Sequence, residues 1–125
     1  MSITADGTNF TVPGVLTAGA IRTGLVSTAV DYPALPTDSV ILVTATGKNV
    51  TLPTAIGVAG KIFTVKLTSA GSLTISTTAS QTIDGSVNLF LIGKNSYVRV
   101  ISDGSNWFII GGGGSTQDVY YGQLY

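Results

Sequence analysis

The clearest pattern of apolar and polar positions lies near the end of the chain. Residues 97–101 alternate, with Val98 and Val100 on one face, whereas 107–110 are apolar at every position. The Asp103-Gly104 pair between them tolerates the positive φ of a tight turn. The pattern predicts a β-hairpin whose second strand is covered on both faces, either in a sandwich core or beneath a neighbouring subunit.

Shorter runs of the same kind precede this hairpin. Residues 40–44 and 49–52 predict one hairpin, and 61–67 and 72–77 predict a second, each with a turn between its strands. Residues 87–92 predict a further strand, and the alternation of 61–67 predicts that Phe63, Val65 and Leu67 face the core. Seven or eight short strands at this spacing require no helix. They predict an all-β fold, a small antiparallel β-sandwich or jelly-roll-like barrel.

The segments on either side of this domain lack a core of their own. Residues 1–24 carry short apolar pieces separated by glycine and proline, yet hold more apolar side chains than a free linker. This favours an extended arm ordered on a partner over a solvated tail. The predicted domains are the arm (1–24), the β-sandwich (25–110), and a glycine hinge with a tyrosine-rich tail (111–125).

Three tyrosines within the last six residues favour an aromatic anchor over a frayed end, because tyrosine supplies contact area at a low entropy cost. The residues expected at contacts between subunits or with a partner are therefore apolar or aromatic: Phe10, Val12, Leu16, Ile21, Trp107, Phe108, Tyr120, Tyr121 and Tyr125.

Charge argues against two classes of partner. The formal net charge is zero, and the six lysines and arginines are scattered along the chain. No field attracts nucleic acid or an anionic membrane, and no apolar run approaches the 18 or so residues of a membrane helix. The first residues lack the basic end and apolar block of a signal peptide, which predicts a protein made and used without Sec export.

The chain offers few groups for catalysis. Histidine, cysteine and glutamate are absent, and the six carboxylates are all aspartates. Asp84 and Asp103 each precede glycine, so turn formation explains them better than a paired-carboxylate hydrolase. Asp103, Ser105 and Asn106 resemble a fragment of a calcium loop but lack its glycine and distal glutamate. We expect no enzyme activity, no cofactor and no metal site.

Three blocks of sequence, in a fixed order, carry a resemblance to a known family. They are V-T-L-P-T-A-x-G-x-A-G-K-x-F-T-V-K from Val50, S-Q-T-I-D-G from Ser80, and V-R-V-I-S-D-G-S-N-W-F-I-I from Val98. Together they resemble a module found in virion proteins of tailed bacteriophages, especially fibres and decoration proteins. The upstream N-F-T-V-P-G-V-L-T-A-G is similar to phrases that lead into such modules.

The resemblance covers about half of the chain. It implies a small β-sandwich that forms a homotrimer, with a structural or adhesive role in the virion. The short chain, beginning at its own Met1, fits a capsid decoration (cement) or head-fibre protein that binds the major capsid protein through its arm. The alternative is a tail-fibre or receptor-binding tip, whose loops at 77–86 or 102–106 would contact host glycan or protein.

Overall fold

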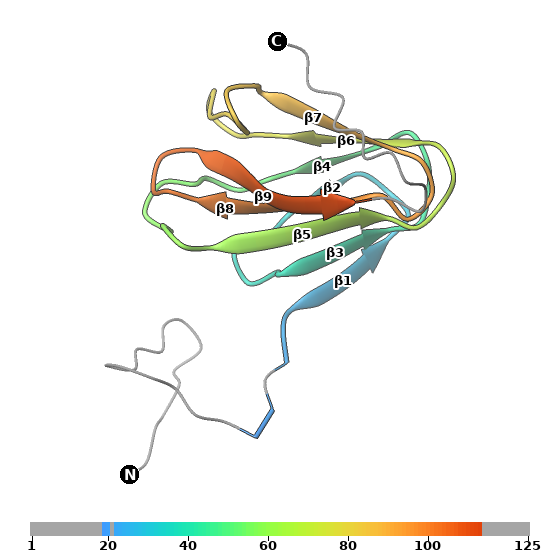
Figure 1. The fold of residues 1–125 in the computed structure, drawn as a ribbon, viewed down its shortest axis with the longest axis horizontal. Coiled ribbons are helices and arrows are strands. Elements are labelled where there is room, and N and C mark those ends of the chain that lie inside the picture. Colours follow the sequence, from blue (N-terminus) through green and yellow to red (C-terminus); the bar gives the residue numbers. More distant parts are fainter. Residues whose placement is uncertain (1–18, 21, 114–125) are drawn as a thin grey trace.

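The computed structural model describes residues 19–20 and 22–113. These residues form two packed sheets, with strand orders β1-β3-β5-β8-β9 and β2-β4-β6-β7 (Figure 1). The strands are β1 (Leu25–Thr28), β2 (Tyr32–Pro33), β3 (Val40–Val43), β4 (Lys48–Thr51), β5 (Ile62–Leu67), β6 (Ser72–Ser76), β7 (Asn88–Ile92), β8 (Tyr97–Ser102) and β9 (Trp107–Gly113). The all-β prediction is confirmed, and the arrangement is consistent with a small β-sandwich.

No helix occurs among the described residues, so none there is long and apolar enough to cross a membrane.

The prediction of an antiparallel sandwich is wrong, because both sheets are mixed. From β1 to β6 the chain alternates between the sheets, and each of β1 to β4 pairs in parallel with the strand two places further on. The strand in the opposite sheet thus serves as the crossover that parallel pairing requires. Only β5–β8, β6–β7 and β8–β9 pair antiparallel.

Two predicted hairpins are therefore wrong. Strands β3 and β4 lie in different sheets, as do β5 and β6, so the turns after Val43 and Leu67 are arches across the core. The β3 strand buries Ile41 and Val43 and β4 buries Val50, each from its own sheet. Hairpins and arches both present one alternating apolar face, so the pattern alone does not separate them.

The β8–β9 hairpin is confirmed, with a bulge opposite Arg99/Val100. The β9 strand runs further than predicted, because Gly111–Gly113 pair with β8 instead of forming a hinge. The ring of Tyr97 packs over Gly113, where a Cβ would lie 3.0 Å from Tyr97 Cε1. The ring of Tyr97 on β8 thus shields the backbone of β9 at a glycine that has no side chain of its own. The arm residues 1–18 and 21, and the tail 114–125, lie outside the described residues.

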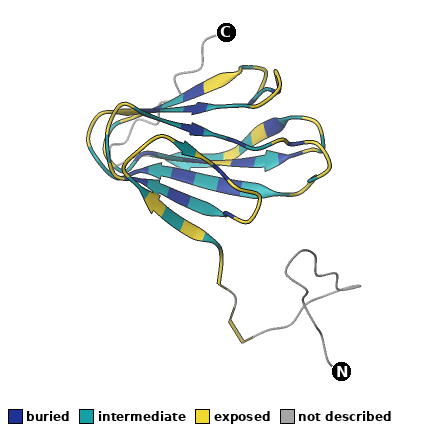
Figure 2. Ribbon diagram, turned by 180° about the vertical axis from the view of Figure 1, so that it is seen from behind, coloured by how far each residue is buried: buried dark blue, intermediate teal, exposed yellow. Residues whose placement is uncertain are grey.

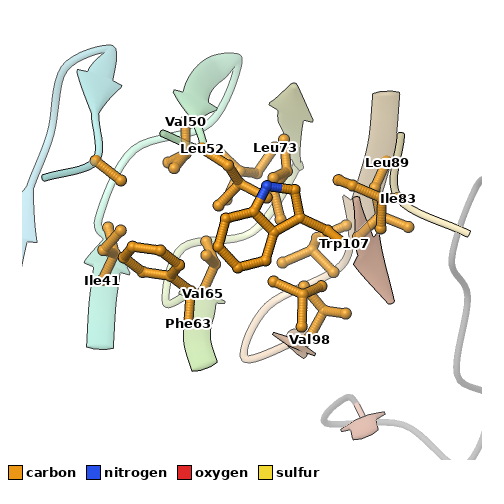
Figure 3. Packing of buried hydrophobic residues seen from close by; sticks show 14 of the residues in the cluster. Ile41, Val50, Leu52, Phe63, Val65, Leu73, Ile83, Leu89, Val98 and Trp107 are labelled. Carbon is orange, nitrogen blue, oxygen red and sulfur yellow. The ribbon is translucent and has the colours of Figure 1, made fainter. Parts of the chain in front are cut away.

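The core lies between the two sheets, and inward side chains from both sheets fill it (Figures 2 and 3). The predicted inward set of β5, Phe63, Val65 and Leu67, is fully buried. Because apolar burial is the main favourable term in folding, this single layer of aliphatic and aromatic side chains fixes both sheets.

One polar group is buried beside this core. Asp38 is 6% exposed and accepts hydrogen bonds from the Tyr32 hydroxyl at 2.7 Å and the Leu35 N–H at 2.8 Å. The backbone carbonyl of Asp38 also accepts a hydrogen bond from Lys61 Nζ. The hydrogen bond to Asp38 raises the pKa of the Tyr32 phenol, and burial and the charge of Asp38 add to that effect. Burial lowers the pKa of the Lys61 ammonium, although Asp38 opposes that shift.

The hydrogen bond between Tyr32 and Asp38 makes the stability of the fold fall at alkaline pH. The raised pKa means that folding favours the protonated phenol, so its contribution is complete below pH 10 and is lost as pH rises through the folded-state pKa. Tyr32→Phe should cost about 1–2 kcal/mol at pH 8 and flatten the loss of stability above pH 10, measured by urea unfolding. Tyr97→Phe, on the outward side of β8, should keep the alkaline loss; equal flattening in both variants would refute the assignment.

Candidate interaction surface

The three blocks that carry the family resemblance meet at Trp107. Its indole is fully buried and packs edge-to-face on Phe63, with ring centroids 5.4 Å apart and an angle of 64° between the ring planes (Figure 3). Ile83, from the second block, forms a β-bridge with Trp107. Phe63 belongs to the first block and Trp107 to the third. The blocks therefore form one contiguous packing unit.

Hydrogen bonds tie the same three blocks together at one end of the sandwich. Gln81 Oε1 accepts from the Ala55 N–H at 2.8 Å, and the Ser102 hydroxyl donates to the Ala55 carbonyl at 2.6 Å. Asn106 Oδ1 accepts from the Thr82 N–H at 3.0 Å. The sequence pattern did not indicate this role for Gln81, since a single amide between turn residues carries no periodic signal. These side chains complete backbone hydrogen bonds, which is a structural role.

The two Asp-Gly pairs form turns, as predicted. Asp84 and Gly85 both have positive φ (48° and 89°), and Asp84 Oδ1 accepts a hydrogen bond from the Ile109 N–H at 3.1 Å. Asp103 Oδ1 accepts from the N–H groups of Ser105 and Asn106, both at 2.9 Å. The bonds from Asn106 and Ser105 lower the pKa of the Asp103 carboxyl. Among the described residues, no three potential ligands from His, Cys, Asp and Glu gather into a metal site.

The outward side of the five-stranded sheet is largely apolar, with Thr64, Lys66 and Arg99 lying among its apolar residues. Its cross-strand register places Ile62, Ile101 and Phe108 in one row over β5, β8 and β9. We call this surface the outer apolar face; its members are Leu25, Val40, Leu42, Ile62, Tyr97, Ile101, Phe108 and the adjoining Ile110 at the bulge. Leu25 is 62% exposed, Phe108 42% and Ile110 48%. No described residue covers this face.

The residues predicted to contact subunits or partners have different positions. Trp107 is 0% exposed, so it packs within its own chain and offers no surface to another protein. Phe108, its neighbour, points outward onto the outer apolar face. The sequence predicted that both sides of the strand 107–110 are covered. The inward side is covered by the core of the same chain, whereas no described residue covers the outward side. The other seven residues lie outside the described part: Phe10, Val12, Leu16, Ile21, Tyr120, Tyr121 and Tyr125.

The outward side of the four-stranded sheet is polar along β4 and β6. Asn49 Nδ2 donates to Thr51 Oγ1 at 3.0 Å and to Ser76 Oγ at 3.1 Å, while Ser76 Oγ donates to Asn49 Oδ1 at 3.2 Å. These polar groups satisfy one another on the surface of β4 and β6. The two outer faces of the sandwich therefore differ, and the apolar one is suited to contact with protein.

No protein-family model and no curated protein matches this chain.

Proposed function

We propose that the chain is a structural protein of a tailed-bacteriophage virion, and that it assembles as a homotrimer through the outer apolar face. The observation that carries the proposal is the apolar row Ile62, Ile101 and Phe108, with exposed Ile110 beside it. Contiguous apolar surface of this kind marks contacts between proteins. The three-block resemblance supplies the virion context, and the blocks build the hairpin that presents Phe108.

The size of this face bears on how the assembly is held. Five strands about 4.8 Å apart and about five residues long span roughly 24 by 17 Å. A stable interface buries about 800 Å² of accessible surface per partner, which is more than the projected area of this face. The arm (1–24) and the tail (114–125) are the parts of the chain that would enlarge the contact.

The proposed location is the capsid surface, where a decoration or head-fibre protein would bind the major capsid protein through its arm. One observation favours the alternative, a tail-fibre or receptor-binding tip. The 102–106 loop is braced by Ser102, which accepts a hydrogen bond from the Gly104 N–H at 2.9 Å, and by Asp103. A loop held in this way could present its backbone to a host glycan or protein at a low entropy cost.

Assembly is tested by replacing two residues of the outer apolar face. The full chain carrying Phe108→Ser and Ile110→Ser should sediment mainly as a monomer at a concentration where the wild type is a trimer, because the contact loses most of its apolar area. Sedimentation velocity measures the masses. The control carries Val30→Ser and Ile56→Ser, which are each 63% exposed but lie outside the face. A monomeric wild type, or equal dissociation of the control, contradicts the proposal.

The virion role is tested by labelling particles with antibodies raised against the full chain. Electron microscopy should show label over the whole capsid, with copy numbers in the hundreds per particle. Label confined to a few copies at the tail supports the fibre alternative. Purified particles that contain no copy of the chain would overturn both locations.

A further inference from the structure

No described strand pairs with the outer edge of β7. β7 (Asn88–Ile92) is the last strand of its sheet, contains neither a charged residue nor proline, and pairs with β6 without a bulge. Val87 and Ile92, at its two ends, are 51% and 55% exposed. Edge strands are usually blocked by charge, proline or a bulge, because an unblocked edge pairs with another strand. None of these blocks is present here.

The hydrogen-bond pattern shows which backbone groups face this edge. The Gly93 N–H donates to the Gly71 carbonyl at 2.8 Å, which makes 71/93 a hydrogen-bonded pair. Such pairs alternate along an antiparallel ladder, so the backbone groups of Asn88, Phe90 and Ile92 point away from β6. They are placed to pair with an added strand.

A cavity of about 370 Å³ lies beside these groups. Its lining comes from Gly85, Ser86, Val87, Asn88 and Phe90, and includes no charged side chain. A strand added to β7 would place alternate side chains over this side of the sheet. The Phe90 ring and the uncharged walls suit an apolar or aromatic side chain.

We infer that the β7 edge accepts residues 9–12 of the arm of a neighbouring copy by β-strand addition, with Phe10 in the cavity. This inference rests on the proposed function for the assembly of copies. Residues 9–12 read N-F-T-V, which alternates and is uncharged, as are β7 and the cavity. The tail is a poorer match, because Asp118 directly precedes its apolar residues.

The position of the arm favours a neighbouring copy over the same chain. The described chain enters through β1, at the edge of one sheet, and β7 lies on the opposite side of the molecule (Figure 1). Only the seven residue steps from Val12 to Gly19 connect the docking segment to the described chain, and they span at most about 25 Å when extended, so the receiving β7 edge belongs to a copy packed directly against this one. A contact between two different surfaces is heterologous, and such contacts close into rings when the rotation allows. A ring of three copies fits the proposed homotrimer.

Cross-linking tests the arrangement, because the natural chain contains no cysteine. Two full chains with different tags, one carrying Thr11→Cys and the other Asn88→Cys, are co-expressed and oxidised. The disulfide between the two tags should form at least tenfold faster than in a control pair of Thr11→Cys with Val30→Cys. Val30 is 63% exposed and lies outside both β7 and the outer apolar face. Equal rates for the two pairs overturn the inference.

Two further variants decide between occupants of the edge. Cross-linking of Asn88→Cys to Thr116→Cys in place of Thr11→Cys would assign the edge to the tail, and a link within a single Thr11→Cys/Asn88→Cys chain would assign it to that chain's own arm. Either result overturns the inference. If the wild type is a trimer that Phe108→Ser with Ile110→Ser dissociates, but no arm link forms, the inference alone fails. A monomeric wild type removes the assembly itself.

Discussion

Replacing Trp107 with alanine is expected to lower the free energy of unfolding by about 3–5 kcal/mol, the usual cost of truncating a fully buried aromatic residue. Trp107 is 0% exposed and packs against Phe63 and Ile83, so its removal leaves a cavity where all three sequence blocks meet. Chemical denaturation at one fixed protein concentration measures the loss, since assembly would otherwise change the apparent stability.

Two matched variants separate packing from other effects. Trp107→Phe should cost less than Trp107→Ala, because the indole N–H makes no hydrogen bond to a described residue and only ring volume is lost. Phe108→Ala, one residue further on and 42% exposed, should change the unfolding of the single chain by less than about 1 kcal/mol. If Phe108→Ala is as destabilising as Trp107→Ala, the two side chains do not have the inward and outward roles described above.

The sequence predicted those elements whose signals are local. The alternation at 97–101 and the Asp-Gly pair identified the β8–β9 hairpin, and Val98 and Val100 are buried as that alternation requires. It also predicted the strand at 87–92 and the buried side of β5. Period-two alternation reports which side of a strand is buried, and this information survives whatever the strand pairs with.

The partners of the strands were not predictable in the same way. Val40–Val43 and Lys48–Thr51 have the composition and turn of a hairpin, yet each pairs in parallel with a strand from a different turn of the chain. An arch and a hairpin bury the same residues. They differ only in whether the two strands pair within one sheet or lie in two facing sheets, and the burial pattern does not report this. The end of β9 was also missed, because glycine has no side chain with which to signal a strand.

The candidate surface was half predicted. The apolar run 107–110 correctly indicated a strand with two apolar sides, but it did not show which side its own chain would cover. That depends on Phe63 and Ile83, which are distant in sequence and meet Trp107 only in the folded chain. Once Trp107 is assigned to the core, Phe108 and Ile110 remain as the residues available to a neighbour.

The arch between β5 and β6 yields the second large prediction. Gly71 has φ +116°, and a Cβ there would lie 1.9 Å from Thr46 Oγ1. Thr46 cannot easily move, because its hydroxyl accepts a hydrogen bond from the Ser72 N–H at 3.0 Å. Gly71→Ala should therefore lose about 3 kcal/mol or more, as backbone strain and a steric clash act together.

Gly57→Ala is the control that isolates the backbone strain. Gly57 has φ +80°, but a Cβ there would meet no heavy atom within 4 Å, so alanine should cost only about 1–2 kcal/mol. Urea unfolding of both variants at the same protein concentration gives the difference, which measures how firmly Thr46 holds the first residues of β6. Equal losses would mean that Thr46 gives way, and that this arch does not hold the two sheets in register.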